Sequence, residues 1–224
     1  GTRAATDIEF LHDYRVTVRR TRSAIGLLRK ALPPAFVHRF SAEFKWLGTE
    51  TTPARDLDVY LEQLPSYEQL LGDADLTPLR VLLTQRQAQA YERIRTMLAS
   101  ARYRGLLDDF DHTLTECETS AFTGSDPESP IAHHQMPVRT FAKQRLARLF
   151  RLVTTQGRAI TDASPAESLH ELRKDCKKLR YGLEFFRSLL PSEQVQQFIR
   201  ALKKLQDNLG AHQDFEVQAD FLRA

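Results

Sequence analysis

The amino-acid sequence predicts an all-α protein from its composition, its apolar spacing and an internal repeat. Of its 224 residues, 42% are hydrophobic and 27% are charged, which suffices for a buried core and excludes a disordered or fibrous chain. Only 9 Gly and 10 Pro occur, a composition that favours helices over turn-rich β architectures. No alternation of β-branched residues is long enough for a sheet. We therefore predict helical bundles with short connections.

Prolines set the limits of the expected helices. A long helix over about residues 7–31 should end at Pro33 and Pro34, and a counterpart should begin after Pro165 and end at Pro191. Each should be followed by a second helix, near 35–50 and 192–209, and by a third, near 54–64 and 211–223. Three further amphipathic stretches also read as helices, at about 76–100, 103–121 and 137–158.

The repeat appears when the sequence is aligned with itself at an offset of 158 residues. Between positions 11–33 and 169–191, seven of 23 pairs are identical, beginning with Leu11-His12 against Leu169-His170. Average composition predicts roughly one or two identities over that length. The repeat therefore predicts two pseudo-two-fold-related four-helix bundles from an internal duplication. We expect one domain over 1–224, with an N-terminal lobe 1–123, a connector 124–136 and a C-terminal lobe 137–224. We expect His133 and His134, in that connector, to be exposed.

Each repeated helix carries one apolar stripe and, one position on, a row of basic residues. The first stripe contains Leu11, Tyr14, Val18, Ile25, Leu28 and Leu32, and the second contains Leu169, Leu172, Cys176, Leu179, Leu183, Phe186 and Leu190. Amphipathic spacing of this kind is typical of core residues. The basic rows are His12, Arg15, Arg19, Arg22 and Arg29, matched by His170, Arg173, Lys177, Arg180 and Arg187.

These rows favour an anionic partner over a solvated charged face. Cations three and four residues apart repel one another, and the nearby acids Asp13, Asp175 and Glu184 are too few to neutralise both rows. The histidines lack the further ligands of a metal site and the nucleophile of a general acid–base site. An imidazole that donates a hydrogen bond to a phosphate oxygen is the remaining interpretation.

Basic and acidic residues also recur in the second and third elements. Lys45 and Lys203 match at the same offset, and either lysine can extend the neighbouring basic row. Asp56 matches Asp214, and this pair is expected to cap a helix or to hold an arginine of the first helix in place. A catalytic role for these carboxylates is the less favoured alternative.

Composition limits the other functional classes. Two cysteines, Cys117 and Cys176, are too few for a disulfide framework, and we expect both to be buried thiols. No apolar run of about 18 residues and no leader-like segment is visible, so we expect no membrane partner and a cytoplasmic location. The formal net charge is only +3, because residues 104–130 hold seven acids against one basic residue, which leaves the rest of the chain more basic.

Three segments resemble the CHAD domain, a histidine-containing α-helical domain. The first is His12-x-x-Arg-x-x-x-Arg-Arg-x-Arg22, and the second joins Trp46-Leu-Gly48 to Arg55-Asp-Leu-Asp-Val59. The third joins the run from His170 to Tyr181 to the run from Leu202 to Gly210. The similarity covers about residues 8–62 and 165–222, while the middle of the chain matches only in length and helical character.

The resemblance implies a non-catalytic module that binds inorganic polyphosphate in a basic channel between two lobes, without a cofactor. It also implies an association with polyphosphate granules or with an attached triphosphatase domain. The implied binding wall, carried over position by position, is His12, Arg15, Arg19, Arg22 and Lys45 with His170, Arg173, Lys177, Arg180 and Lys203. Arg20, Lys174 and Lys178 are expected at its rim, and Arg55, Asp56 and Asp214 as orienting residues. In the second copy, Gln213 stands at the position that matches Arg55.

Three rival functions remain open, of which one, a scaffold that docks an acidic protein, has no distinguishing mark in the sequence. The first is an enzyme that processes polyphosphate, with Asp56 and Asp214 holding a metal ion. The second is a protein that binds the phosphate backbone of a nucleic acid. The nucleic acid is disfavoured because the basic rows contain few aromatic side chains on which bases stack.

Overall fold

Every described element of the computed structural model is helical, so the chain has the all-α fold that the sequence predicts. The structure describes residues 8–72, 75–123 and 136–223, with the side chains of 117–123 and 211–223 left aside. The elements are α1 (Ile8–Leu28), α2 (Pro34–Leu71), α3 (Thr77–Ala99), α4 (Ala101–Thr123), α5 (Val138–Ala159), α6 (Ala166–Phe185), a 3-10 helix η2 (Arg187–Leu189) and α7 (Ser192–Arg223). None of these helices has an apolar stretch long enough to cross a lipid bilayer.

The chain divides into two compact units, residues 1–129 and 130–224. The first unit contains α1 to α4, and the second contains α5, α6, η2 and α7. The expected connector 124–136, with His133 and His134, lies almost entirely outside the described residues, so that part of the predicted organisation stays a prediction. Each unit is described below by itself.

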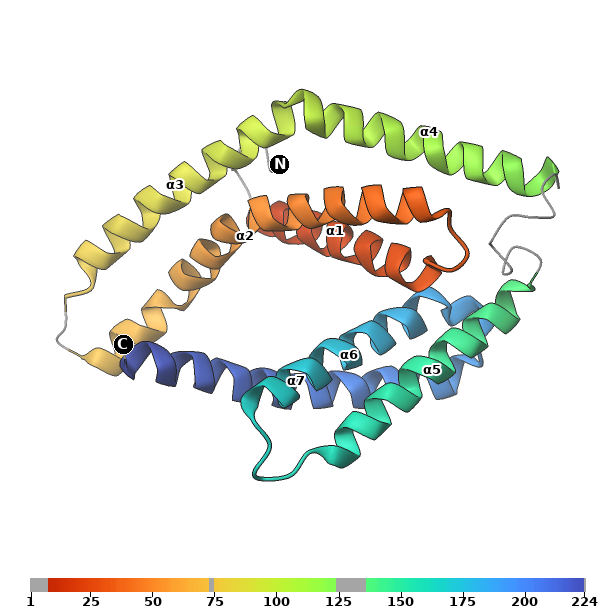
Figure 1. Ribbon diagram of the computed structural model, residues 1–224. Helices are drawn as coiled ribbons and strands as arrows, with labels where there is room; N and C mark the ends of the chain where they lie inside the picture. The colour runs from red at the N-terminus through yellow and green to blue at the C-terminus, as the bar shows by residue number, and fades with distance from the viewer. Residues whose placement is uncertain (1–7, 73–74, 124–135, 224) are drawn as a thin grey trace. The chain divides into compact units, whose positions relative to one another are not determined.

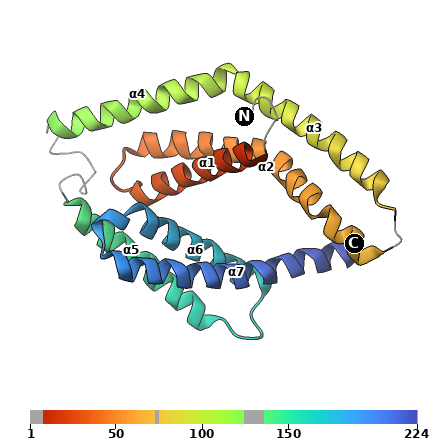
Figure 2. The same cartoon turned by 180° about the vertical axis from the view of Figure 1, so that it is seen from behind.

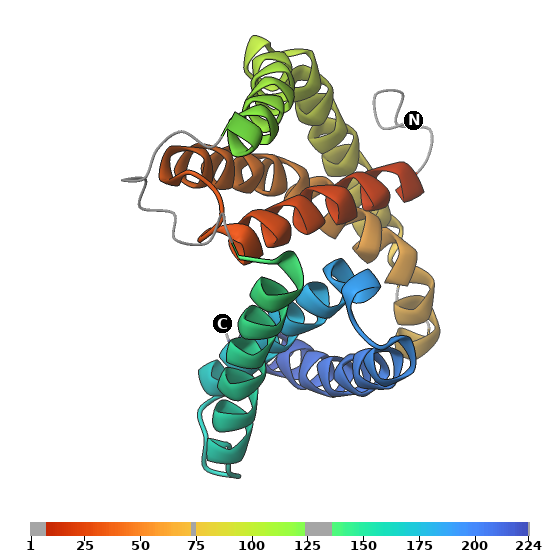
Figure 3. The same ribbon diagram turned by 90° about the vertical axis from the view of Figure 1, so that its right-hand side faces the viewer.

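In the first unit, α1 packs along α2 and α2 along α3, while α4 follows α3 end to end after Ser100 and also contacts α2 (Figure 1). Figures 1 and 3 show α1 beside the first half of α2. The core joins Leu11, Val18 and Ile25 of α1 to aromatic residues of α2 and to Ile94 and Met97 of α3. Phe110 of α4 closes it, with its ring 5.0 Å from the rings of both Phe40 and Phe44. The apolar stripe expected on the first repeated helix is therefore the face that α1 buries.

Ion pairs on the surface add to the contact between α2 and α4. Arg39 of α2 pairs with Asp109 of α4, and Arg102 Nε of α4 lies 3.0 Å from Glu43 Oε2 of α2. The Arg102 guanidinium also lies over the ring of Trp46, 3.9 Å from its centre. Exposed ion pairs contribute little on their own, so the aromatic packing dominates this interface. The pairs nevertheless show that part of the acidic segment is used within the unit.

In the second unit, α6 packs against both α5 and α7, and Figure 2 shows α6 and α7 side by side. Leu172, Cys176, Leu179, Leu183 and Phe186 are buried, so most of the predicted second stripe forms the core. Burial and the neighbouring Asp175 raise the pKa of the Cys176 thiol to about 11, so it is an inert core thiol. The side chain of Cys117 lies outside the described set.

The predicted breaks after residues 50 and 209 are wrong, because α2 and α7 each continue through them. Pro53 removes one donor from α2, and Figure 1 shows this helix bending along its length. Before the proline, two threonine hydroxyls bond carbonyls one helical turn back. Thr51 Oγ1 donates to Leu47 O at 2.8 Å, and Thr52 Oγ1 donates to Gly48 O at 2.8 Å. Ala54 and Leu64 beyond it are buried, and their packing holds the helix together. The helix ends at Gly72, where φ is 59°.

The other helix limits agree with the predicted ones within three residues, except that α2 ends at Leu71, seven residues after the predicted limit of 64, and α6 ends at Phe185, before the expected end at Pro191. Ser100 separates α3 from α4: its Oγ accepts a hydrogen bond from Tyr103 N at 3.1 Å, as an N-cap does. Both α6 and α7 begin 158 positions after α1 and α2, respectively. The described part of the second unit nevertheless has only three α-helices and one 3-10 helix. The internal duplication is therefore not confirmed by the fold.

Candidate anion-binding site

The basic row of α1 lies at the edge of its buried stripe. Leu11 and Val18 are buried, whereas His12, Arg19 and Arg22 are exposed and Arg15 is half-buried. Consecutive residues are turned by about 100° around a helix, so a side chain next to a core position emerges where the helix pair meets solvent. The packing of α1 on α2 thus places these cations along one edge of the first unit.

Arg15 is fixed to α2 by three neutral oxygens. Its Nη1 donates to Thr51 Oγ1 at 2.8 Å, to Gly48 O at 3.0 Å and to Thr52 Oγ1 at 3.2 Å. Burial lowers the pKa of the Arg15 guanidinium, the Asp56 carboxylate opposes that shift, and the Arg19 and Arg55 charges add to it. Arginine stays protonated in proteins, so Arg15 is a positive charge that its direct partners do not neutralise.

Arg22 lies next to Arg15 over the same small residue of α2. A Cβ atom built on Gly48 would lie 3.4 Å from Arg22 Nη1, so the absence of a side chain at Gly48 leaves room for the guanidinium. Arg22 is exposed, and no carboxylate of the described residues lies within ion-pair distance of it. Lys45, also exposed, precedes Gly48 by three residues and so extends from a neighbouring position on α2.

In the second unit, Arg173 of α6 lies against Gly210 of α7. A Cβ on Gly210 would come within 3.1 Å of Arg173 Nη2, which is closer than an ordinary van der Waals contact. Arg173 Nε is buried and has no hydrogen-bond partner among the described residues. The α6–α7 pair therefore repeats one feature of α1–α2: an arginine of the first helix packs over a glycine of the second.

Other predicted cations of α6 have acidic partners. Lys174 Nζ lies 2.5 Å from Glu171 Oε1, and Lys178 Nζ lies 2.7 Å from Asp175 Oδ1. Asp175 is buried and also accepts a hydrogen bond from Gln156 of α5 at 2.9 Å. Arg180 donates to Glu184 and to Gln206. In the α6 row, Arg180 is thus paired with a carboxylate, as are Lys174 and Lys178, which were expected at the rim.

The predicted residues of each unit lie on two neighbouring helices. His12, Arg15, Arg19, Arg20 and Arg22 lie on α1, with Lys45, Arg55 and Asp56 on α2. His170, Arg173, Lys174, Lys177, Lys178 and Arg180 lie on α6, with Lys203 on α7. Asp214 is in α7, but its side chain is outside the described set.

One expected role of the carboxylates is corrected. Asp56 and Asp214 lie inside continuous helices, so neither begins a helix that it could cap. Asp56 does act electrostatically on Arg15, although the hydrogen bonds of Arg15 go to Thr51, Thr52 and Gly48. The sequence reasoning missed these three partners, because threonine and glycine carry no charge pattern.

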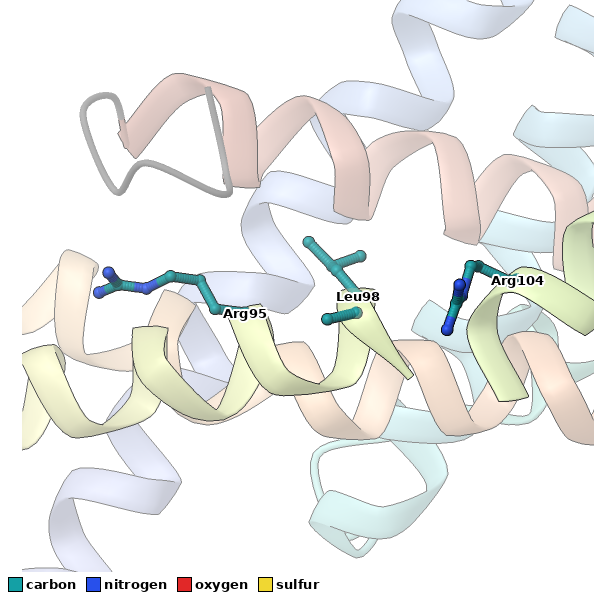
Figure 4. A pocket seen from close by; sticks show the side chains of 4 residues that line it. Arg95, Leu98 and Arg104 are labelled. Carbon is teal, nitrogen blue, oxygen red and sulfur yellow. The ribbon is translucent and has the colours of Figure 1, made fainter. Parts of the chain in front are cut away.

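Two further features of the described residues bear on ligand binding: the distribution of metal-ligating side chains and a pocket outside the basic rows. No group of three or more His, Cys, Asp or Glu that could hold a metal ion occurs among them. A pocket near the junction of α3 and α4 is lined by Arg95, Leu98, Ala99 and Arg104. Figure 4 shows Arg95 and Arg104 on opposite sides of Leu98, not directed at a common point. Arg95 Nε also lies 3.3 Å from Glu92 Oε2, so this pocket lacks converging donors.

The fold and these residues define an all-helical module that displays rows of cations on paired helices. The CHAD domain family model matches residues 1–223, and the chain belongs to that family. A crystal structure of the CHAD domain from the plant Ricinus communis is similar, with 29% sequence identity and a TM-score of 0.73. That match covers 97% of this chain and 68% of the plant chain. No curated protein sequence matches this chain.

Proposed function

We propose that this CHAD domain binds inorganic polyphosphate through the basic rows of α1–α2 and α6–α7, without catalysing a reaction. The observation that carries the proposal is Arg15, hydrogen-bonded to Gly48 and two threonine hydroxyls, beside the exposed Arg22, with no carboxylate bonded to either guanidinium among the described residues. A cation held in place without a counter-ion is stabilised when an anion binds, because charge-assisted hydrogen bonds are about twice as strong as neutral ones.

The shape of the row favours a linear polyanion over a single phosphate ion. His12, Arg15, Arg19 and Arg22 follow one another along one side of α1. At 1.5 Å per residue the row is about 15 Å long, which is several times the size of one phosphate group. A flexible chain of phosphates can contact each of these residues in turn. Family membership supports the same ligand, because the CHAD resemblance implies polyphosphate.

The experiment is a calorimetric titration of the purified chain with long-chain polyphosphate at two salt concentrations. We expect binding that His12→Ala/His170→Ala and Arg19→Ala/Lys177→Ala weaken. The charge-matched control for the second double variant is Arg86→Ala/Arg139→Ala, which removes two exposed arginines of α3 and α5 outside the rows. Equal loss in this control would mean that net charge, not the rows, determines affinity.

Two further measurements test the rival functions. The length of the recovered polymer, after incubation with and without Mg²⁺, should be unchanged; metal-dependent shortening would indicate the enzyme. Competition with single-stranded RNA tests the second rival, and we expect polyphosphate to displace RNA because the rows offer few rings on which bases stack. Binding of RNA with equal or higher affinity would contradict the proposal.

A further inference from the structure

Arg22 and Arg180 occupy matched positions in the two helix pairs. They are 158 residues apart, the same separation as between the starts of α1 and α6 and of α2 and α7. Each reaches a matched position on the following helix: Arg22 approaches Gly48, and Arg180 Nε donates to Gln206 Oε1 at 3.0 Å. Position 206 is again 158 residues after position 48. The two arginines therefore permit a direct comparison of their surroundings.

The surroundings of the second arginine neutralise it. Arg180 Nη1 donates to Glu184 Oε1 at 2.8 Å, one helical turn further along α6. Its guanidinium also lies 4.7 Å from the centre of the Tyr181 ring. Only 17% of the Arg180 side chain is exposed. The bond to Gln206 joins Arg180 to α7, and the charged hydrogen bond to Glu184 and the Tyr181 ring hold it on α6.

The first unit has glycine at both corresponding positions. Gly26 stands where the second unit has Glu184, and Gly48 stands where it has Gln206. Arg22 consequently has neither a side-chain acceptor from α2 nor a carboxylate one turn ahead on α1. It is exposed, and within the described residues its guanidinium makes no ion pair.

We propose that the two matched arginines bind phosphate unequally: Arg22 contacts the polyanion, whereas Arg180 joins α6 to α7 through Gln206 and has its charge already neutralised by Glu184. This inference rests on the proposed function and specifies which of the two arginines contributes more to the affinity for polyphosphate. A phosphate that approached Arg180 would have to displace a bonded carboxylate and would gain little, because one anion replaces another. At Arg22 the phosphate displaces only water.

The first test compares Arg22→Gln with Arg180→Gln in polyphosphate titrations at equal salt. Loss of a charge-assisted contact should weaken the affinity of Arg22→Gln about tenfold. Arg180→Gln should weaken affinity at most about twofold but should lower the unfolding midpoint, since it removes the bond to Gln206 of α7 and the charged bond to Glu184. Circular dichroism establishes that both variants are folded before affinities are compared. Equal weakening by the two variants would overturn the inference.

The second test gives Arg22 the surroundings of Arg180. A Cβ at Gly26 would meet nothing within 4 Å, so Gly26→Glu fits, and its carboxylate lies one turn from Arg22. We expect Gly26→Glu to weaken polyphosphate binding about fivefold by neutralising Arg22. Gly26→Gln controls for size. Gly157→Glu controls for charge, because Gly157 is exposed on α5 and has equally free space.

The outcomes separate the inference from the proposed function. If the unmodified chain does not bind polyphosphate, the proposed function fails and the inference fails with it. If it binds, but Gly26→Glu and Gly157→Glu weaken binding equally, the function stands and the asymmetry is wrong. Selective weakening by Arg22→Gln and by Gly26→Glu supports both.

Discussion

At the scale of single residues, the first unit contains a fully buried carboxyl group. Asp58 of α2 is 0% exposed and accepts hydrogen bonds from Gln87 Nε2 at 2.8 Å and from Tyr91 Oη at 3.0 Å. Burial raises the pKa of Asp58, and the two hydrogen bonds and the Arg55 charge oppose that shift only in part. Asp58 therefore links α2 to α3 through two hydrogen bonds, while its negative charge has a cost.

The cost of burying the Asp58 charge predicts how the stability of Asp58→Asn should depend on pH. Because the folded-state pKa of Asp58 lies above the unfolded value, the residue contributes most to stability at low pH, and that contribution is lost as pH rises through the folded pKa. Asparagine keeps the shape without the charge. The free energy of unfolding of the variant, relative to the unmodified chain, should therefore increase between about pH 4 and pH 7. Urea unfolding of both proteins at several pH values measures this difference in free energy. A difference that stays constant with pH would contradict the prediction.

At the scale of elements, the contact between α1 and α2 depends on a polar group inside the packed interface. Thr51 is 0% exposed; its Oγ1 accepts a hydrogen bond from Arg15 and donates one to Leu47 O just before Pro53. A single hydroxyl thus joins the two helices and also bonds a carbonyl near the bend of α2. The Thr51 hydroxyl therefore contributes both to the position of Arg15 in the basic row and to the continuity of α2.

A double-mutant cycle with Arg15→Met and Thr51→Val tests this link. The hydrogen bond between the two side chains should give a coupling free energy of about 1 kcal/mol in urea unfolding. The matched control is Thr49→Val on the same helix, since the exposed Thr49 hydroxyl bonds only to Lys45 O. Coupling of Arg15 to Thr49 as large as to Thr51 would show that the cycle reports a general change in α2.

At the scale of the whole molecule, charge is distributed unevenly along the chain. The acids of α4 are used in part to bind α2, as in the pair of Arg39 with Asp109, while the cations of α1 face solvent. Binding of a polyanion to such rows releases counterions, so affinity should fall steeply with salt. The slope of log affinity against log salt concentration gives the number of phosphates that are neutralised.

We therefore predict a salt dependence that distinguishes a cation of the α1 row from one outside the rows. For a flexible single-stranded polyanion the slope of log affinity against log salt is about −0.7 per phosphate neutralised. Arg22→Gln should make the slope less steep by about 0.7, and Arg86→Ala, outside the rows, should leave it unchanged. Titration at four or more salt concentrations gives the slopes. A slope near zero for the unmodified chain would contradict electrostatic binding by either row.

The sequence by itself determined the all-helical class, most helix limits, the buried stripes of α1 and α6 and the resemblance to the CHAD family. These features follow from local periodicity, because a side chain's place on a helix face depends only on its neighbours in the chain. Bonds between helices depend on how the two helices pack, so only the tertiary structure decided that Arg15 bonds Thr51 and that Arg180 bonds Gln206, whereas the pair of Arg180 with Glu184 follows from their spacing on one helix. It also decided that α2 continues through Pro53, since buried residues on both sides of the proline offset its local cost.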